Sequence, residues 1–351
     1  MTGTTAITLG PVLIGIASTR LSEAEKKLLC HPAVGGVVLF ARNINSAGQV
    51  ANLCTEIRAL REPRLLITID QEGGRVQRLR EGFTRLPPLR ALGDIYRSDQ
   101  DQGRDFAYRH GRVMATEVLD LGIDLSFAPV VDLDRGSCVI ADRSPGADAD
   151  QVIDLSRAYI AGMRDAGMAA CGKHYPGHGS VELDSHLDDV IDQRSADEIL
   201  TADLKPFAEL STELASIMVA HVTYPAIDEH PAGYSKRWLK QILRDQIAYT
   251  GVIISDDLDM FAACAVGDMP TRVGLALNSG CDLVLICKAE SAAEYLNQVS
   301  ISTIDASQHI KQLYGRSLVS RNDARQVSEY RQWVTSLEAL NAKGSDSNAF
   351  T

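Results

Sequence analysis

Eight short apolar runs recur along the 351-residue chain, and each is followed by a longer amphipathic stretch. Most of the runs are rich in β-branched residues and apolar on both faces, as expected of parallel strands that are buried from both sides. The runs cover residues 12–17, 36–40, 65–70, 125–131, 168–174, 217–221, 252–256 and 283–287. Because eight strands would alternate with helices, the pattern predicts a single (β/α)8 TIM-type barrel of the α/β class.

The segments between the runs have helical periodicity. In residues 46–61, Ser46 is a candidate N-cap, and Val50 and Leu53 lie on one face. The other predicted helices cover residues 104–121, 150–166, 197–214, 236–249 and 271–279. Residues 304–340 are also amphipathic, so we expect a C-terminal helical extension on the outside of the barrel.

The uninterrupted alternation of predicted strands and helices indicates how many domains the chain has. Two doubly wound domains would also alternate β and α, but no linker or composition shift interrupts residues 12–287. We therefore expect one barrel domain over residues 1–340. Residues 341–351 are polar and contain glycine, so we expect a disordered tail there.

The composition argues against a nucleic-acid-binding, membrane-spanning or secreted protein. A net charge of −11 and a pI near 5.2 argue against a nucleic-acid partner, because such binding depends on clustered Lys and Arg. No run approaches the about 18 apolar residues that span a bilayer, and residues 1–10 do not resemble a secretory signal. The scattered cysteines, never spaced as Cys-x-x-Cys, are typical of buried thiols in a reducing compartment. They are Cys30, Cys54, Cys138, Cys171, Cys264, Cys281 and Cys287. We expect a cytoplasmic protein without a membrane or nucleic-acid partner.

Polar residues follow four of the predicted strands. The third run ends in residues 70–78, the fifth in residues 172–179, the sixth in His221 and the seventh in residues 256–257. An isolated Asp or His at such a place is more often a helix cap or a structural residue. Four strands that bring such groups to one rim favour a ligand site, because burying them without a ligand is costly.

Asp256 and Asp257 cannot share one role. Successive side chains on a strand point in opposite directions, so we expect one carboxylate to face the pocket and the other to face away. A carboxylate at a barrel mouth can attack an electrophilic carbon or bind a cation. The less favoured metal site would use His174, His178, His186 and Asp256.

The segment after the fifth run also contains Asp184 and His186. A carboxylate two residues from an imidazole can orient it as a general base, although an Asp that caps a turn beside an exposed His fits equally well. Gly177 and Gly179 would allow this loop to move over a substrate. The glycine turn at residues 73–74 lacks the spacing of phosphate-binding loops.

Six motifs along the chain carry a family resemblance. They are Asp70-Gln-Glu-Gly-Gly-Arg75, Phe83-Thr-Arg-Leu-Pro87, Ser126-Phe-Ala-Pro-Val-Val-Asp132, Gly172-Lys-His-Tyr-Pro-Gly-His-Gly179, Asp184-Ser-His186 and Ile254-Ser-Asp-Asp-Leu258. Between Leu13 and Cys287 the chain resembles the family 3 glycoside hydrolases, in particular the bacterial cytoplasmic β-N-acetylglucosaminidases of peptidoglycan recycling. One departure is Tyr175, where Phe is common in that family.

The resemblance implies a role for each matching residue. Asp256, directly after Ser255, matches the nucleophile. His186 matches the proton donor and acceptor, and Asp184 the residue that orients it, in place of the second carboxylate of most glycosidases. The implied substrate-binding residues are Asp70, Arg78, Arg143, Lys173 and His174.

The resemblance also implies a reaction, in which a retaining exo-enzyme removes terminal β-linked N-acetylglucosamine through a covalent glycosyl-enzyme. The implied partner is a small molecule, the N-acetylglucosamine–1,6-anhydro-N-acetylmuramic acid muropeptide. No metal or organic cofactor is expected, and the protein is expected to be a monomer. Two alternatives remain open. One is a phosphorylase that uses phosphate as the acceptor. The other is a non-catalytic sugar-binding barrel, which should lack the nucleophile or the acid.

Overall fold

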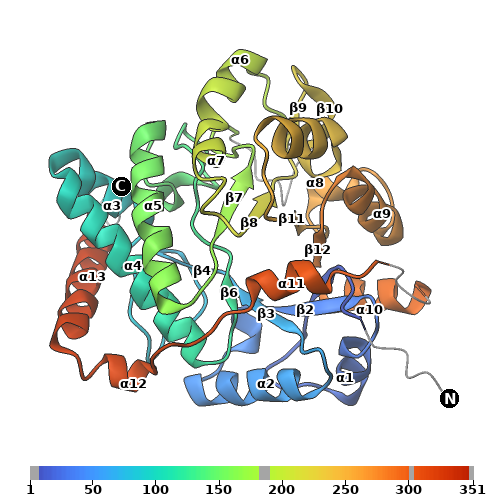
Figure 1. Cartoon of the computed structure of the whole chain (residues 1–351), viewed down its shortest axis with the longest axis horizontal. Helices are drawn as coiled ribbons and strands as arrows, with labels where there is room; N and C mark the ends of the chain where they lie inside the picture. The colour runs from blue at the N-terminus through green and yellow to red at the C-terminus, as the bar shows by residue number, and fades with distance from the viewer. Residues whose placement is uncertain (1–7, 182–189, 300–303, 348–351) are drawn as a thin grey trace.

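The computed structural model describes residues 8–181, 190–299 and 304–347, and Figure 1 shows central strands surrounded by helices. The eight parallel strands are β1 (Val12–Gly15), β2 (Val34–Leu39), β3 (Leu66–Ile69), β6 (Leu125–Ser126), β7 (Cys171–Tyr175), β8 (Ser216–Val219), β11 (Val252–Asp257) and β12 (Leu283–Ile286). Their order in the sheet is β6-β3-β2-β1-β12-β11-β8-β7. Each strand lies at one of the eight apolar runs, so the predicted (β/α)8 barrel is confirmed.

The barrel closes between β7 and the residues that follow β6. The Val131 N–H donates a hydrogen bond to the Lys173 carbonyl oxygen over 2.9 Å. Pro129 has no N–H to donate, which explains why regular pairing ends at Ser126 although the apolar run continues over residues 125–131. Every residue of β2 and β3 is buried, as expected for strands that are covered by helices and also face a filled barrel interior.

Helices cover the outside of the barrel, and two small hairpins lie apart from the main sheet. The α-helices are α1 (Glu23–Leu29), α2 (Ala47–Ala59), α3 (Leu89–Ser98), α4 (Gln100–Asp120), α5 (Ala149–Ala166), α6 (Ala196–Glu198), α7 (Lys205–Glu209), α8 (Phe261–Cys264), α9 (Met269–Ser279), α10 (Ala289–Gln298), α11 (Ser307–Leu313), α12 (Arg321–Ala324) and α13 (Ser328–Ser347). The hairpins pair β4 (Gln71–Gly73) with β5 (Val76–Gln77), and β9 (Thr223–Tyr224) with β10 (Asp228–Pro231).

Two predicted helices differ from regular α-helices. The prediction of one helix over residues 197–214 is wrong, because α6 and α7 are separated by a π-helical turn at Ile199–Asp203. Pro206 lies in the first turn of α7, where its missing N–H is tolerated, and a continuous α-helix would place it in the interior. The segment predicted at residues 236–249 is a π-helix at Arg237–Gln246.

The predicted C-terminal helical extension consists of three helices, α11, α12 and α13. As Figure 1 shows, α13 lies on the outside of the barrel, where it packs against α4 and α3. Between α11 and α12 the chain passes close to the barrel, and a Cβ atom at Gly315 would lie 2.4 Å from the Asp124 carbonyl oxygen. This close passage interrupts the helical pattern.

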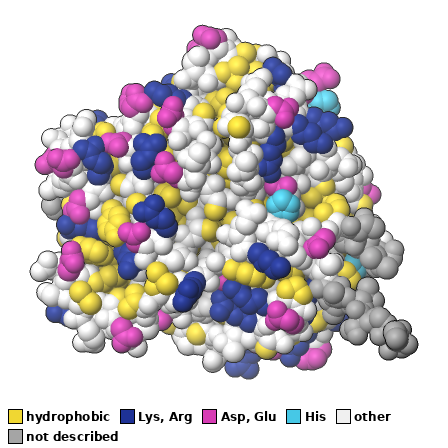
Figure 2. Space-filling model, in the orientation of Figure 1, with side chains coloured by type: hydrophobic (Ala, Val, Ile, Leu, Met, Phe, Trp, Pro, Cys, Tyr) yellow, Lys and Arg dark blue, Asp and Glu magenta, His cyan; other side chains and the backbone are white. Residues whose placement is uncertain are grey.

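Helix α13 continues to Ser347, past residue 340, where the polar tail was expected to begin. Ala342 is a strong helix former, so polar composition alone does not end the helix there. Residues 348–351 lie outside the described residues. On the face shown in Figure 2, acidic and basic side chains are interspersed.

Candidate active site

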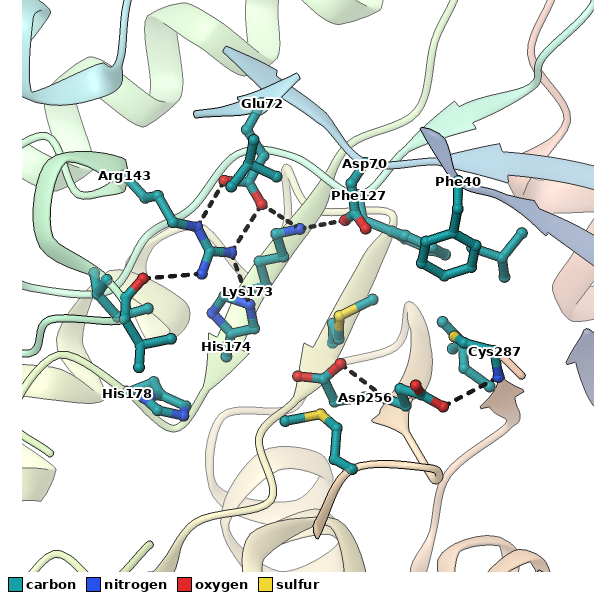
Figure 3. A pocket seen from close by; sticks show the side chains of 18 of the residues that line it. Phe40, Asp70, Glu72, Phe127, Arg143, Lys173, His174, His178, Asp256 and Cys287 are labelled. Carbon is teal, nitrogen blue, oxygen red and sulfur yellow. Dashed lines mark hydrogen bonds and ion pairs between the residues drawn. The ribbon is translucent and has the colours of Figure 1, made fainter. Parts of the chain in front are cut away.

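A cavity of about 330 Å³ opens at the carboxyl ends of the barrel strands (Figure 3). It is lined by Val38, Phe40, Asp70, Glu72, Arg75, Val76, Arg78, Phe127, Cys138, Val139, Ile140, Arg143, Lys173, His174, His178, Met218, Asp256, Asp257, Met260, Leu285 and Cys287. These residues come from segments spread over residues 38–287. The parallel strands bring them together because their carboxyl ends share one rim.

Lys173, on β7, lies between two carboxylates. Its Nζ atom is 2.8 Å from Asp70 Oδ1 and 2.6 Å from Glu72 Oε1. Burial opposes the charge on Lys173, but the two carboxylates outweigh it and raise the pKa of the ammonium group above its usual value. Burial likewise opposes ionisation of Glu72, but Arg143 and Lys173 hold the pKa of its carboxyl group far below the usual range. Both groups are therefore ionised at neutral pH.

Arg143 forms a two-pronged contact with Glu72. Its Nε atom lies 2.9 Å from Glu72 Oε2, and its Nη2 atom lies 2.8 Å from Glu72 Oε1. The same Nη2 atom lies 3.3 Å from His174 Nε2 (Figure 3). A bidentate arginine–carboxylate contact fixes both planes, so the guanidinium group is held toward the cavity.

Asp132 contacts His174 on β7 and His178 in the loop after it. Its Oδ2 atom lies 2.7 Å from His174 Nδ1, and its Oδ1 atom accepts the backbone N–H groups of His174 (3.1 Å) and His178 (2.8 Å). Burial works against ionisation of Asp132, but His174 and His178 hold the pKa of its carboxyl group below the usual range. This geometry favours a proton on His174 Nδ1 and leaves Nε2 as the acceptor that faces Arg143.

Burial lowers the pKa of His178 to about 4, so this ring is neutral at neutral pH. The glycines on either side of His178 permit close packing. A Cβ atom at Gly179 would lie 1.6 Å from the Leu133 carbonyl oxygen, and one at Gly177 would lie 2.8 Å from Asp203 Cβ. Both glycines are buried, so these contacts, rather than freedom of the loop, account for glycine at the two positions.

Asp256 and Asp257 both line the cavity at the end of β11. The Asp257 carboxyl group is bound to the backbone N–H groups of Asp259 and Cys287, and the expectation that one of the two carboxylates faces away stays a prediction. The pairing of β11 with β12 shifts register between Ile254 and Asp257, and such a bulge interrupts the alternation of side chains. Burial opposes ionisation of Asp256, but His174, His221 and the Asp257 N–H hold the pKa of its carboxyl group below the usual value. Burial raises the pKa of Asp257 to about 6.

A glycine hairpin positions Arg78. Gly73 (φ +106°) and Gly74 (φ +55°) turn the chain between β4 and β5 in a conformation that other residues rarely adopt. Gln71 Oε1 then accepts the Arg78 backbone N–H over 2.9 Å. Arg78 Nη2 lies 3.5 Å from Asp70 Oδ2, so its guanidinium group is near the carboxylate that also contacts Lys173.

Comparisons with known proteins identify the family of the chain. A model of the glycosyl hydrolase family 3 N-terminal domain matches residues 9–317. The chain belongs to glycosyl hydrolase family 3. It is 49% identical over 301 residues to a beta-hexosaminidase of Hydrogenovibrio crunogenus, covering 85% of this chain and 84% of the relative. It is 46% identical over 328 residues to one of Alkalilimnicola ehrlichii, covering 93% and 94%.

A solved structure of the same family has the same fold. NagZ from Neisseria gonorrhoeae, in complex with N-trifluoroacetyl-D-glucosamine, superposes with a TM-score of 0.90 at 44% identity. The superposition covers 95% of this chain and 99% of NagZ. Family membership makes this chain a glycoside hydrolase, as its motifs predict.

Within this family 3 barrel, six of the eight predicted site residues are described, and all six line the cavity. They are Asp70, Arg78, Arg143, Lys173, His174 and Asp256. The other two, Asp184 and His186, lie outside the described residues. Their predicted roles are not tested by this geometry.

Asp132 and Glu72 were not among the predicted site residues. Asp132 has a signal in the sequence, because it is the first charged residue after the apolar run at residues 125–131. Glu72 follows Asp70 by two residues, and only the fold reveals that it contacts both Lys173 and Arg143.

Other sequence-based expectations can be compared with the described residues. Within the described residues no cysteine forms a disulfide, and Cys30 and Cys138 are exposed rather than buried. Exposure depends on packing that cysteine spacing does not encode. No group of three or more His, Cys, Asp or Glu side chains within these residues could hold a metal ion. No helix in the same part of the chain has the length and apolar character needed to cross a membrane.

Proposed function

We propose that this glycoside hydrolase is a retaining exo-β-N-acetylglucosaminidase that forms a covalent glycosyl-enzyme on Asp256. The observation that carries the proposal is the state of the Asp256 carboxyl group, which lines the cavity with a pKa below its usual value. A nucleophile must be ionised at the working pH, and a carboxylate is the nucleophile of most retaining glycosidases.

The choice of sugar is supported by the relatives. Proteins that are 46–49% identical are named beta-hexosaminidase, and the Neisseria gonorrhoeae structure holds N-trifluoroacetyl-D-glucosamine. In this proposal, ring hydroxyls and the acetamido group are bound by charged side chains that can donate or accept several hydrogen bonds. These side chains are Asp70, Arg78, Arg143, Lys173 and His174.

We assign the proton transfers to His186, oriented by Asp184. His186 protonates the departing oxygen and then removes a proton from the attacking water. Both residues lie outside the described residues, so the assignment depends on their spacing and on the family resemblance. It is supported by the state of Glu72, because a carboxyl group whose pKa is held so low by Arg143 and Lys173 holds no proton to donate at neutral pH.

The proposed natural substrate is the N-acetylglucosamine–1,6-anhydro-N-acetylmuramic acid muropeptide of cell-wall recycling. This assignment places the protein in the cytoplasm as a monomer that acts on a small molecule, without a metal or organic cofactor. The net charge of −11 agrees with a partner other than nucleic acid. The cavity, at about 330 Å³, is of a size that suits a sugar ring.

Mass spectrometry after incubation with a 5-fluoro-N-acetylglucosaminyl fluoride tests nucleophile and mechanism together. We expect one covalent sugar per chain, on the peptide that contains Asp256, and no label on Asp256→Asn. A label on another residue would refute the assignment. Release of N-acetylglucosamine from an aryl glycoside should occur at the same rate with and without phosphate. A requirement for phosphate, with a sugar 1-phosphate as product, would instead identify a phosphorylase.

A further inference from the structure

Asp257 joins the end of β11 to two neighbouring segments through one oxygen atom. Its Oδ1 atom accepts the Asp259 backbone N–H over 2.9 Å and the Cys287 backbone N–H over 3.1 Å. The first donor lies in the turn after β11, and the second lies directly after β12. Asp257 still pairs with Leu285 in the strand ladder, and its carboxyl group accepts the Cys287 N–H just beyond this last pair.

The backbone of the same residue contacts the proposed nucleophile. The Asp257 N–H donates a hydrogen bond to Asp256 Oδ1 over 2.8 Å. The peptide that carries this N–H follows the register shift between Ile254 and Asp257, so the strand ladder does not hold it in the regular way. Ser255 Oγ donates a hydrogen bond to the carbonyl oxygen of this peptide over 2.7 Å, and His221 Nε2 lies 3.3 Å from the same oxygen. The N–H end of the peptide is anchored by the side-chain contacts of Asp257.

We propose that Asp257 is a positioning residue for the nucleophile, an inference that rests on the proposed role of Asp256. By binding the Asp259 and Cys287 N–H groups, its side chain fixes the peptide whose N–H holds the Asp256 carboxylate in line for attack. Misplacing a reacting group by about 1 Å can cost about 100-fold in rate, so the effect should be visible in kcat.

The groups around Asp257 indicate whether its positioning role requires a negative charge on the carboxyl group. Asp256 on β11, Asp259 in the turn and the Cys287 thiol after β12 face its carboxyl group, and each is acidic or neutral. Burial raises the pKa of Asp257 to about 6, with Asp259 and Asp256 acting in the same direction. A protonated carboxyl group can still accept at Oδ1, and so can the carbonyl oxygen of an amide. Positioning should therefore survive loss of the charge but not loss of the oxygen.

Two substitutions separate these properties. Asp257→Asn keeps an acceptor oxygen and removes the charge, whereas Asp257→Ala removes both. We expect Asp257→Ala to lower kcat by about 100-fold with little change in KM, and Asp257→Asn to stay within about 5-fold of the wild type. The matched control is Asp259→Ala, which removes a neighbouring carboxyl group but keeps the N–H that Asp257 binds. It should also stay within about 5-fold.

The kinetics use an aryl β-N-acetylglucosaminide and a disaccharide with a poor leaving group. A positioning residue affects both substrates alike in Asp257→Ala. If Asp257→Asn is as slow as Asp257→Ala, or if the loss is confined to the poor leaving group, Asp257 takes part in proton transfer and the proposal is wrong. A wild-type rate for Asp257→Ala would also overturn it.

Crystal structures of the wild type and both variants test the positioning without relying on activity. The distance from the residue 257 nitrogen to Asp256 Oδ1 should remain near 2.8 Å in the wild type and Asp257→Asn, and should lengthen in Asp257→Ala. An unchanged distance in Asp257→Ala refutes the positioning role. An inactive wild type with the expected distances would instead refute the proposed function alone. If Asp257→Ala does not fold, Asp257→Ser, with its shorter side chain, replaces it in both measurements.

Discussion

Lys173 Nζ lies 2.6 Å from Glu72 Oε1, and both side chains are almost completely buried, with exposed fractions of 2% and 4%. Buried ions of opposite charge are tolerated only when they are well paired. Arg143 occupies both oxygens of the same carboxylate. Glu72 therefore fixes two cations that face the cavity, Lys173 and Arg143. A substitution of Glu72 should disturb both of these side chains.

Glu72→Gln should destabilise the fold by about 3 kcal/mol at pH 7, because it leaves Lys173 and Arg143 under-compensated in a buried site. Urea unfolding of both proteins measures this change. The folded-state pKa of Glu72 lies far below its unfolded value, so its stabilisation is present above the unfolded pKa and is lost as pH falls. The two proteins should therefore converge in acid.

The matched control is Glu56→Gln. Glu56 forms a 3.0 Å pair with Lys26 on the surface, where both side chains are partly exposed. Exposed pairs contribute about 1 kcal/mol or less, so this variant should unfold almost like the wild type. Equal losses in the two variants would mean that the buried network has no special role.

The barrel could be predicted from the sequence because its strands are distinct. The predicted run at residues 36–40, for example, is apolar throughout, and the strand found there, β2, is buried along its whole length, as expected for a parallel strand covered on both faces. The register shift before Asp257 could not be predicted, since a bulge depends on how β11 pairs with β12 rather than on residue type. The role of Glu72 could not be predicted for a similar reason, because its partners come from distant segments, Lys173 from β7 and Arg143 from the loop after β6.

The raised pKa of Asp257 predicts a pH dependence of stability. In the folded state its pKa is about 6, so between about pH 4 and pH 6 the folded chain binds a proton that the unfolded chain has lost. The contribution of Asp257 to the free energy of unfolding should therefore fall as pH rises through this window. Asp257→Asn has no proton to lose, so relative to the wild type it should be more stable at pH 7.5 than at pH 4, by roughly 3 kcal/mol.

Urea unfolding at both pH values measures the difference. The control is Asp245→Asn, an exposed carboxylate, which should follow the wild type at both pH values. A constant difference between Asp257→Asn and the wild type would show that Asp257 has an ordinary pKa in the fold.

Asp256→Ala should lower kcat on an aryl β-N-acetylglucosaminide by more than about 10⁴-fold, because it removes the proposed nucleophile. The fold should be retained, as measured by circular dichroism. Azide should restore part of the rate and give the α-glycosyl azide, since it attacks from the face that the carboxylate has vacated. If Asp256→Ala remained active and Asp257→Ala were inactive, the two assignments would be exchanged.

Proton NMR of the earliest product should show β-N-acetylglucosamine before mutarotation. Two successive displacements at the anomeric carbon restore the starting configuration, whereas a single displacement by water inverts it. If the α-anomer forms first, the covalent intermediate on Asp256 must be abandoned.

His186→Ala should lose far more rate on a natural disaccharide than on an aryl glycoside with an acidic phenol. A poor leaving group needs a proton in order to depart, whereas an acidic phenol leaves without one. Asp184→Ala should follow the same pattern, because a histidine without its orienting carboxylate loses both basicity and direction. The wild-type pH optimum should lie near neutrality, as for an enzyme that uses an imidazole.

The comparison depends on separating proton transfer from sugar binding. If His186 only binds sugar, both substrates should suffer equally, and mostly through KM. Lys173→Met provides this reference. Lys173 is proposed to bind the sugar of both substrates, so the substitution should weaken the binding of both to the same extent. Equal losses in His186→Ala would return the acid role to another residue. Asp70 would then be tested before Glu72, because Arg143 and Lys173 keep Glu72 ionised.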